Sequence, residues 1–118
     1  MALNKFSDKI VFSILSKINV GYLEITNYQG KVFRFGNPQD DLKAQLKIKN
    51  PNFSFNLIKS GSIGFAESYM RGEFETDNLS NLIEITARNI KIIYKFSGLL
   101  DFPIINFLKG IFIKNTKN

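Results

Sequence analysis

The chain has 118 residues, the size of one domain with a single core. It contains no cysteine and no histidine, which excludes disulfides, Cys-His and Ser-His-Asp catalysis and the common zinc sites. Sixteen basic against ten acidic residues give a net charge of +6, which favours anionic partners such as phospholipid or nucleic acid.

The first half of the chain predicts a helix followed by three strands. Apolar residues recur at helical spacing over residues 7–17, which predicts an amphipathic helix. Residues 20–26 and 31–35 alternate in hydropathy and are joined by a short connection ending in glycine, which predicts a β-hairpin. Residues 42–49 alternate most regularly, with apolar residues on one side and mostly lysines on the other. This pattern predicts a strand with a buried face and a basic, solvated face.

An Asn-Pro pair predicts the start of a helix over residues 50–60. The side chain of Asn50 can accept hydrogen bonds from the first free backbone N–H groups, and Pro51 fits the first helical position. Gly61 suits the position just beyond the helix end, where a left-handed conformation is needed. We therefore expect the helix to stop at this glycine.

The remainder of the chain is mostly apolar. Residues 79–89 predict an amphipathic helix, with Asp77 or Ser80 as its cap. A last helix is predicted to open at residues 101–103, with an apolar face up to residue 112. Residues 99–113 are the longest apolar stretch, but polar interruptions keep it below the roughly 20 apolar residues of a transmembrane span. No secretory signal is visible. We expect a cytoplasmic protein that lies peripherally on the inner membrane surface.

The segment 61–77 is the most densely specified part of the sequence. Its glycines indicate positions where the backbone takes a positive φ or is closely approached. They are Gly61, Gly64 and Gly72. Apolar residues between them have helical spacing, so we expect a short buried helical turn between glycine bends. We expect Glu67 within it to be partly buried, with a partner such as Tyr69 or Arg88.

Four acidic residues of this segment raise the question of a metal site. They are Glu67, Glu73, Glu75 and Asp77. Converging carboxylates can bind a hard cation. However, Glu73 and Glu75 alternate as residues on a strand face do, and Asp77 suits a helix cap. We therefore expect no metal ion here.

Two runs of the chain carry a family resemblance. Residues 44–53 read Ala-Gln-Leu-Lys-Ile-Lys-Asn-Pro-Asn-Phe, and residues 61–72 read Gly-Ser-Ile-Gly-Phe-Ala-Glu-Ser-Tyr-Met-Arg-Gly. With the helix start at residues 77–79, these runs resemble the N-terminal domain of the cyclopropane-fatty-acyl-phospholipid synthases in order and spacing. The resemblance is good over residues 21–89 and weak elsewhere. The motif residues are Gly61, Gly64, Glu67, Ser68, Tyr69 and Gly72.

Two positions depart from the family pattern. Arg71 stands where the family usually has Asp, which reverses a charge at the glycine bend. Glu73 and Phe74 stand where the family commonly has a pair of aromatic residues. Neither departure removes the glycines or the Glu-Ser-Tyr core of the motif.

The resemblance implies an accessory role in a larger enzyme. Members of this family transfer a methylene carbon from S-adenosylmethionine to the double bond of a phospholipid acyl chain, using a large C-terminal domain. No Gly-rich adenosyl-binding loop follows a strand in this chain. We therefore expect a non-catalytic N-terminal domain with no cofactor of its own, and S-adenosylmethionine as the cofactor of the parent enzyme. Residues 1–98 would form this domain, and residues 99–118 a helix and a join to the catalytic domain.

The fold class that we predict is α+β, with a small, mostly antiparallel sheet covered by helices. The resemblance implies a likeness to sterol-carrier-type lipid-binding domains. It also implies three partners: phospholipid or a membrane surface, an attached or separate catalytic domain, and a second copy in a homodimer. A stand-alone lipid-carrier domain is an alternative.

Two sets of side chains are candidates for lipid contact. The acyl-chain candidates are Phe53, Leu57, Phe65, Tyr69 and Met70. The headgroup candidates are Lys43, Lys47, Lys49, Lys109 and Lys114. The alternative for the first set is that it is only core, because aromatic residues at helical spacing are more often core than ligand site. The alternatives for the strand lysines are a plain solvated face or a platform for nucleic acid, although the chain has no nucleic-acid motif.

Overall fold

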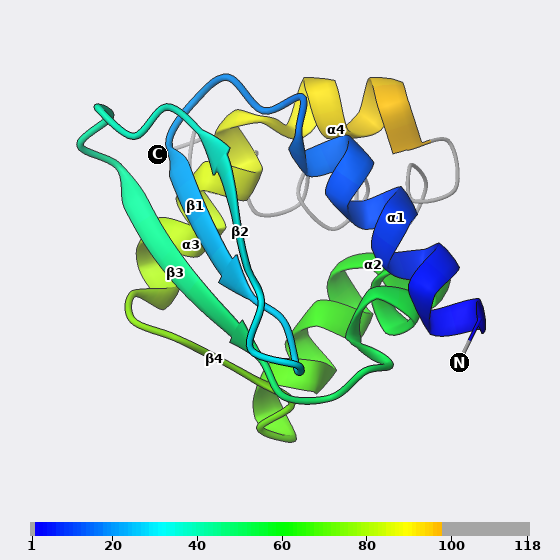
Figure 1. Ribbon diagram of the computed structural model, residues 1–118. Coiled ribbons are helices and arrows are strands. Elements are labelled where there is room, and N and C mark those ends of the chain that lie inside the picture. Colours follow the sequence, from blue (N-terminus) through cyan, green and yellow to red (C-terminus); the bar gives the residue numbers. More distant parts are fainter. Residues whose placement is uncertain (1, 98–118) are drawn as a thin grey trace, which may run out of the picture.

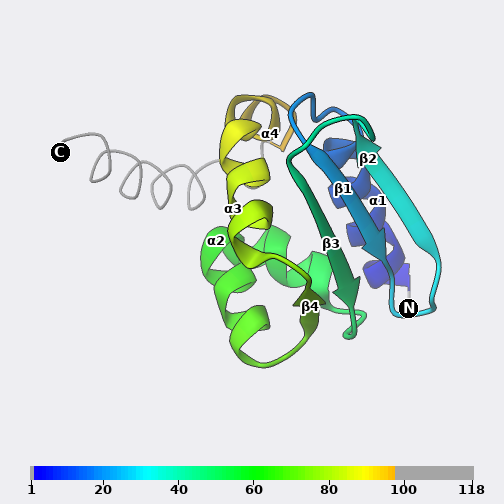
Figure 2. The same cartoon turned by 90° about the vertical axis from the view of Figure 1, so that its left-hand side faces the viewer.

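A sheet and a layer of helices make up the molecule (Figures 1 and 2), so the predicted α+β class is confirmed. The structure is a computed structural model that describes residues 2–97. In chain order the elements are α1 (Ala2–Leu15), β1 (Tyr22–Thr26), β2 (Val32–Gly36), β3 (Lys43–Ile48), α2 (Phe53–Met70), β4 (Phe74–Thr76), α3 (Leu79–Arg88) and α4 (Ile90–Ser97). The helix and join expected at residues 99–118, with Lys109 and Lys114, lie outside the described residues.

The sheet has the strand order β2-β1-β3-β4. The outer pairings, β1 with β2 and β3 with β4, are antiparallel as expected. The central pairing of β1 with β3 is parallel. The chain reaches this parallel position through the turn between β2 and β3, and Asp40 stabilises that turn. Its carboxylate accepts hydrogen bonds from the backbone N–H groups of Leu42 at 2.9 Å and Gly21 at 2.8 Å. These two donors lower the pKa of Asp40.

The two faces of the sheet differ in burial. Leu23 and Ile25 of β1 and Leu46 of β3 point to the helices and are buried, whereas the alternate residues of β3 are exposed. This is the alternation that the sequence predicts for both strands. Figures 1 and 2 show the helices gathered against one face of the sheet, so no helix of residues 2–97 covers its other face. Phe12 of α1 joins the layers, since its ring centroid lies 4.6 Å from that of Phe33.

The helix boundaries differ from the predicted ones in three places. Helix α1 begins at Ala2 instead of residue 7. Asn50 and Pro51 precede α2 and do not begin it, and the side chain of Asn50 accepts a hydrogen bond from the N–H of Asn52 in a turn. Helix α3 is capped by Asn78 and not by Asp77 or Ser80. Asp, Asn and Ser are all favoured helix caps, so the local sequence alone could not show which of these neighbouring residues caps α3.

Asn89 connects the helices to the sheet. Its side chain is only 1% exposed and accepts hydrogen bonds from the backbone N–H groups of Asn19 at 2.9 Å and Val20 at 3.1 Å. It donates to the carbonyl oxygens of Val20 at 2.8 Å and Ile85 at 2.7 Å. One amide therefore satisfies four backbone groups, and it fixes the end of α3 beside the loop that leads into β1.

We predict that Asn89→Leu lowers the free energy of unfolding by about 3 kcal/mol, because it leaves several buried backbone groups without partners. Urea unfolding followed by circular dichroism would measure this loss. The control is Asn81→Ala, which removes a solvent-accessible hydrogen bond to the carbonyl of Lys43 and should cost about 1 kcal/mol or less. Equal losses in the two variants would contradict the role given to Asn89.

Candidate functional site: an apolar pocket behind a bent helix

Helix α2 is bent at Gly61. The backbone of Gly61 has φ 55° and ψ −132°, a mirror-image extended conformation that only glycine enters without strain. Gly61 therefore ends the first helical segment of α2, as predicted, and a second helical segment follows it up to Met70. The conformation of Gly61 is extended and not the predicted left-handed helical one. The predicted short helical turn is the second segment of α2.

Gly64 shows how sharp this bend is. A Cβ atom at Gly64 would overlap the carbonyl oxygen of Asn56, eight residues earlier. In a straight helix eight residues span about 12 Å. The second half of α2 is thus folded back against the first, and only a residue without a side chain fits at the contact.

The far end of α2 is fixed by Gly72. Gly72 has φ +71°, and its N–H donates to the carbonyl of Tyr69 at 3.0 Å, while the N–H of Glu73 donates to the carbonyl of Ser68 at 2.9 Å. This pair of bonds is a Schellman motif. The side chain of Arg71 bonds Glu73 at 2.8 Å and lowers its pKa. Arg71 and Glu73 therefore compensate each other's charge at this bend.

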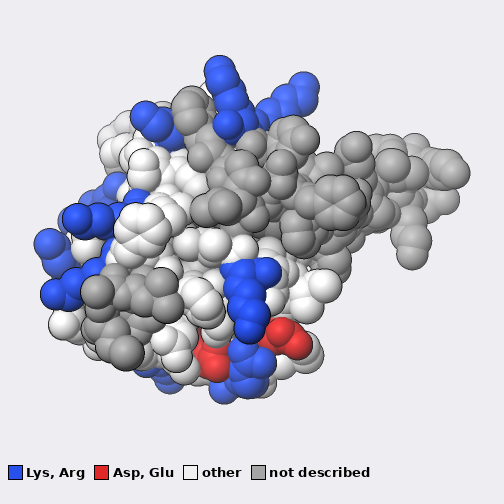
Figure 3. Space-filling model, turned by 90° about the vertical axis from the view of Figure 1, so that its right-hand side faces the viewer, with Lys and Arg blue, Asp and Glu red and all other residues white. Residues whose placement is uncertain are grey.

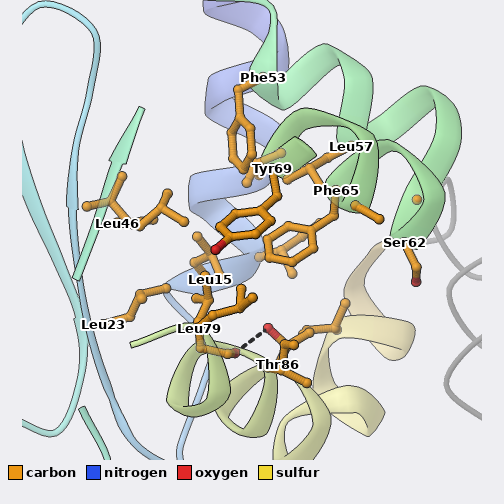
Figure 4. A pocket seen from close by; sticks show the side chains of 18 of the residues that line it. Leu15, Leu23, Leu46, Phe53, Leu57, Ser62, Phe65, Tyr69, Leu79 and Thr86 are labelled. Carbon is orange, nitrogen blue, oxygen red and sulfur yellow. Dashed lines mark hydrogen bonds between the residues drawn. The ribbon is translucent and has the colours of Figure 1, made fainter. Parts of the chain in front are cut away.

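An apolar pocket of about 380 Å³ lies between the bent helix, the other helices and the inner face of the sheet (Figure 4). Its lining residues come from six elements. They are Val11, Phe12, Ile14 and Leu15; Leu23, Ile25 and Leu46; Phe53, Leu57, Gly61, Ser62, Phe65, Ala66, Tyr69 and Met70; and Leu79, Leu82, Ile83, Thr86 and Ile93. Its volume is within the range of about 300–1,000 Å³ that is typical of ligand sites.

The pocket has a floor and a mouth. Ile25 and Leu46 of the sheet are buried and form its floor. Three lining residues are exposed and mark its mouth, Tyr69 at 44%, Met70 at 75% and Ile83 at 44%. The mouth therefore lies between the end of α2 and α3. These helices pack mainly on other elements, α2 on α1 and α3 on β3, so their facing apolar side chains leave the gap open.

All five predicted acyl-chain candidates line this pocket. They are Phe53, Leu57, Phe65, Tyr69 and Met70. Phe53 is buried in the core, and Leu57 and Phe65 are partly buried against it. The alternative interpretation, that these residues are only part of the core, therefore fits Phe53. It does not account for the exposure of Tyr69 and Met70. In Figure 4 the rings of Phe65 and Tyr69 point from α2 toward the sheet side of the pocket.

Phe74 of β4 is a pocket-supporting residue that the sequence analysis did not single out. It is 1% exposed, and its ring centroid lies 5.2 Å from Phe53, 5.0 Å from Phe65 and 5.6 Å from Tyr69. Its position between Glu73 and Glu75 in an alternating strand was the available signal, because it places the ring on the face opposite the carboxylates.

The polar side chains of the pocket are hydroxyls. They belong to Ser62, Tyr69 and Thr86, and that of Thr86 donates to the carbonyl of Leu82 at 3.0 Å. Within residues 2–97 no group of three or more carboxylates could hold a metal ion. Glu67 is exposed, so the prediction that it is partly buried is wrong. The lining is thus suited to an apolar molecule.

The strand lysines lie on the opposite face of the sheet from the pocket. Lys43, Lys47 and Lys49 all point to solvent. The Nζ atom of Lys49 bonds Glu75 at 2.7 Å, and that of Lys43 lies 5.9 Å from the centroid of the Tyr22 ring. The structure thus does not bring these three lysines and the predicted acyl-chain residues together, because the lysines point away from the face of the sheet that the helices cover.

No family model, curated protein or solved structure matches this chain. The resemblance to the cyclopropane-fatty-acyl-phospholipid synthases and the likeness to sterol-carrier folds therefore stay predictions. Among the helices of residues 2–97, none has the length and apolar character needed to cross a bilayer.

We predict that Gly64→Ala lowers the free energy of unfolding by about 2 kcal/mol, because its methyl group overlaps the backbone of Asn56. The loss should come with weaker binding of apolar ligands. Gly72→Ala is the control: nothing lies within 4 Å of its Cβ position, so it should cost about 1 kcal/mol of backbone strain and leave the pocket intact. Thermal melts together with binding of an apolar dye would compare them. A stable Gly64→Ala variant with unchanged dye binding would contradict this role of the bend.

Proposed function

We propose that this chain is an acyl-chain-binding domain, and that it serves as the non-catalytic accessory part of an S-adenosylmethionine-dependent enzyme that modifies phospholipid acyl chains. The observation that carries the first part is the apolar pocket with an exposed apolar mouth. The sequence resemblance supports the second part. The domain would position the hydrocarbon chain, and the attached or separate transferase would supply the chemistry.

The lining fits a hydrocarbon chain better than a polar ligand. Apart from a few hydroxyls the walls are aliphatic or aromatic, so a charged or strongly polar ligand would lose its hydration without gaining hydrogen bonds. At about 0.8 kcal/mol per buried methylene, a segment of roughly ten methylenes gains about 8 kcal/mol, which corresponds to micromolar affinity before ordering costs.

The mouth fits a chain that enters end-on from a larger lipid. Tyr69, Met70 and Ile83 expose apolar surface around the opening, which can stay in contact with the part of the lipid that remains outside. The nearby cationic side chains Arg71 and Arg88 are paired with Glu73 and Glu84. These ion pairs neutralise the two arginines, so recognition of the lipid at the opening depends on apolar contact.

We predict that Ala66→Trp weakens binding of a pyrene-labelled fatty acid by about tenfold or more, because the indole fills the pocket while the acyl chain loses a few buried methylenes. The control is Ile63→Trp, which adds an indole on the same helix at an exposed position outside the lining. It should change the affinity by less than about twofold, because surface changes of this kind have small effects. Fluorescence titration of the full chain would measure both affinities.

A second variant keeps this test informative if Ala66→Trp fails to fold. Ile83→Glu places a carboxylate at the exposed mouth, where the fold tolerates it and an entering hydrocarbon does not. It should also weaken the binding of the labelled fatty acid. Unchanged affinity in a folded Ala66→Trp or Ile83→Glu variant, or an equal loss in Ile63→Trp, would contradict the proposed function.

A further inference from the structure

The surface formed by α1, α2 and α4 has a different charge pattern from the rest of the described molecule. These three helices contain only two acidic residues, Asp8 and Glu67. Asp8 is half-buried and accepts a hydrogen bond from the hydroxyl of Ser54 at 2.6 Å. Glu67 lies beyond the bend of α2. Figure 3 views this side and shows Lys and Arg side chains predominating over Asp and Glu in its described part.

Four exposed lysines form what we call the helical basic face. They are Lys5, Lys9, Lys59 and Lys91. Helix α1 packs on both α2 and α4, and a small apolar cluster of Ile14 and Ile93 with Ile10 and Ile58 holds the three helices together beneath these lysines. Within residues 2–97, no carboxylate lies within salt-bridge distance of any of the four.

The arginines differ from these lysines because they are ion-paired. All three arginines of the sequence are paired with glutamates: Arg34 with Glu24 at 3.3 Å, Arg71 with Glu73 at 2.8 Å and Arg88 with Glu84 at 2.6 Å. Arginine is the cation that reads bases and single phosphates through paired hydrogen bonds, whereas lysine acts as a point charge. A face of unpaired lysines suits a diffuse anionic surface better than nucleic acid.

An exposed aromatic ring lies on the same helix as two of these lysines. Phe6 of α1 is 61% exposed and is adjacent to Lys5 in the sequence, and Lys9 follows one helical turn after Lys5. Aromatic and basic side chains on one helix face are typical of segments that lie in the membrane interface, with the ring among the acyl chains and the lysines at the headgroups.

We propose that the helical basic face is the surface with which this domain docks on a bilayer containing anionic phospholipid. The strand lysines are then not the headgroup contacts. This inference rests on the proposed function, since a domain that binds acyl chains must meet the membrane that holds them. It adds that docking uses α1, α2 and α4, and that the open face of the sheet points away from the bilayer.

Two variants with matched charge test this assignment in the full chain. One carries Lys5→Gln, Lys9→Gln and Lys91→Gln on the helical basic face. The other carries Lys31→Gln, Lys43→Gln and Lys47→Gln on exposed positions of the hairpin turn and sheet. Each lowers the net charge by three. Co-sedimentation with vesicles of phosphatidylcholine and phosphatidylglycerol, against vesicles of phosphatidylcholine alone, measures partitioning.

The helical variant should lose roughly 100-fold in partitioning to the anionic vesicles, since each lysine near such a surface contributes about a fivefold factor. The sheet variant should lose far less. Phe6→Ser, which leaves the charge unchanged, should lower partitioning to both kinds of vesicle. Equal losses in the two lysine variants, or no loss in the helical one, would overturn the proposal.

Binding of a single-stranded oligonucleotide at the same salt concentration tests whether the partner of this face is nucleic acid instead of a lipid surface. Oligonucleotide binding that the helical variant loses, together with unchanged vesicle binding, would assign the face to nucleic acid and overturn the proposal. Failure of the acyl pocket is distinguishable, because Ala66→Trp is assayed with a labelled fatty acid in solution without vesicles. Vesicle binding that depends on the helical lysines while the fatty acid does not bind would support the docking face and reject the pocket.

Discussion

The fold-back of α2 at Gly61 is the constraint on which the pocket depends. A straight helix from Phe53 to Met70 would extend about 27 Å and pass beyond the small sheet that it covers. With the bend, both halves of the helix face the sheet, one contributing Phe53 and the other Phe65. Gly64 makes the bend possible because its missing side chain admits the backbone of Asn56. The glycines of this segment thus shape a cavity and are not themselves a site of chemistry.

Because helices cover only one face of the sheet, the apolar pocket and the strand lysines lie on opposite sides of it. Along β3 buried residues alternate with exposed ones, so Leu46 lines the pocket while Lys43 and Lys47 face solvent. The helices carry both apolar lining residues and lysines, because α1, α2 and α4 contribute apolar lining from their inner sides and lysines from their outer sides. Amphipathic helices can therefore connect the pocket with a membrane surface in a way that the sheet cannot.

Local periodicity was sufficient for most of the fold. The hairpin and the alternating burial of β3 follow from spacing alone, whereas the choice of the five acyl-chain candidates also used the family resemblance. The parallel pairing of β1 with β3 and the link made by Asn89 could not be predicted, because both depend on contacts between residues far apart in sequence. The interruption of the helix at Gly61 could be predicted, because a glycine with positive φ commonly ends a helix. The return of the second segment against the first could not, because it depends on the contact of Gly64 with the backbone of Asn56. The exposure of Glu67 depends on how that bend orients the second half of the helix.

Methyl nuclear magnetic resonance of the full chain with oleic acid tests the central claim, that a hydrocarbon chain enters this pocket, most directly. The account predicts that the methyl signals of Ile25, Leu46 and Leu57 shift on titration and show intermolecular contacts to the methylenes of the ligand. Val32, which is exposed on an edge strand, should not shift. Shifts confined to exposed methyl groups such as that of Val32, with the signals of Ile25, Leu46 and Leu57 unchanged at saturation, would contradict it.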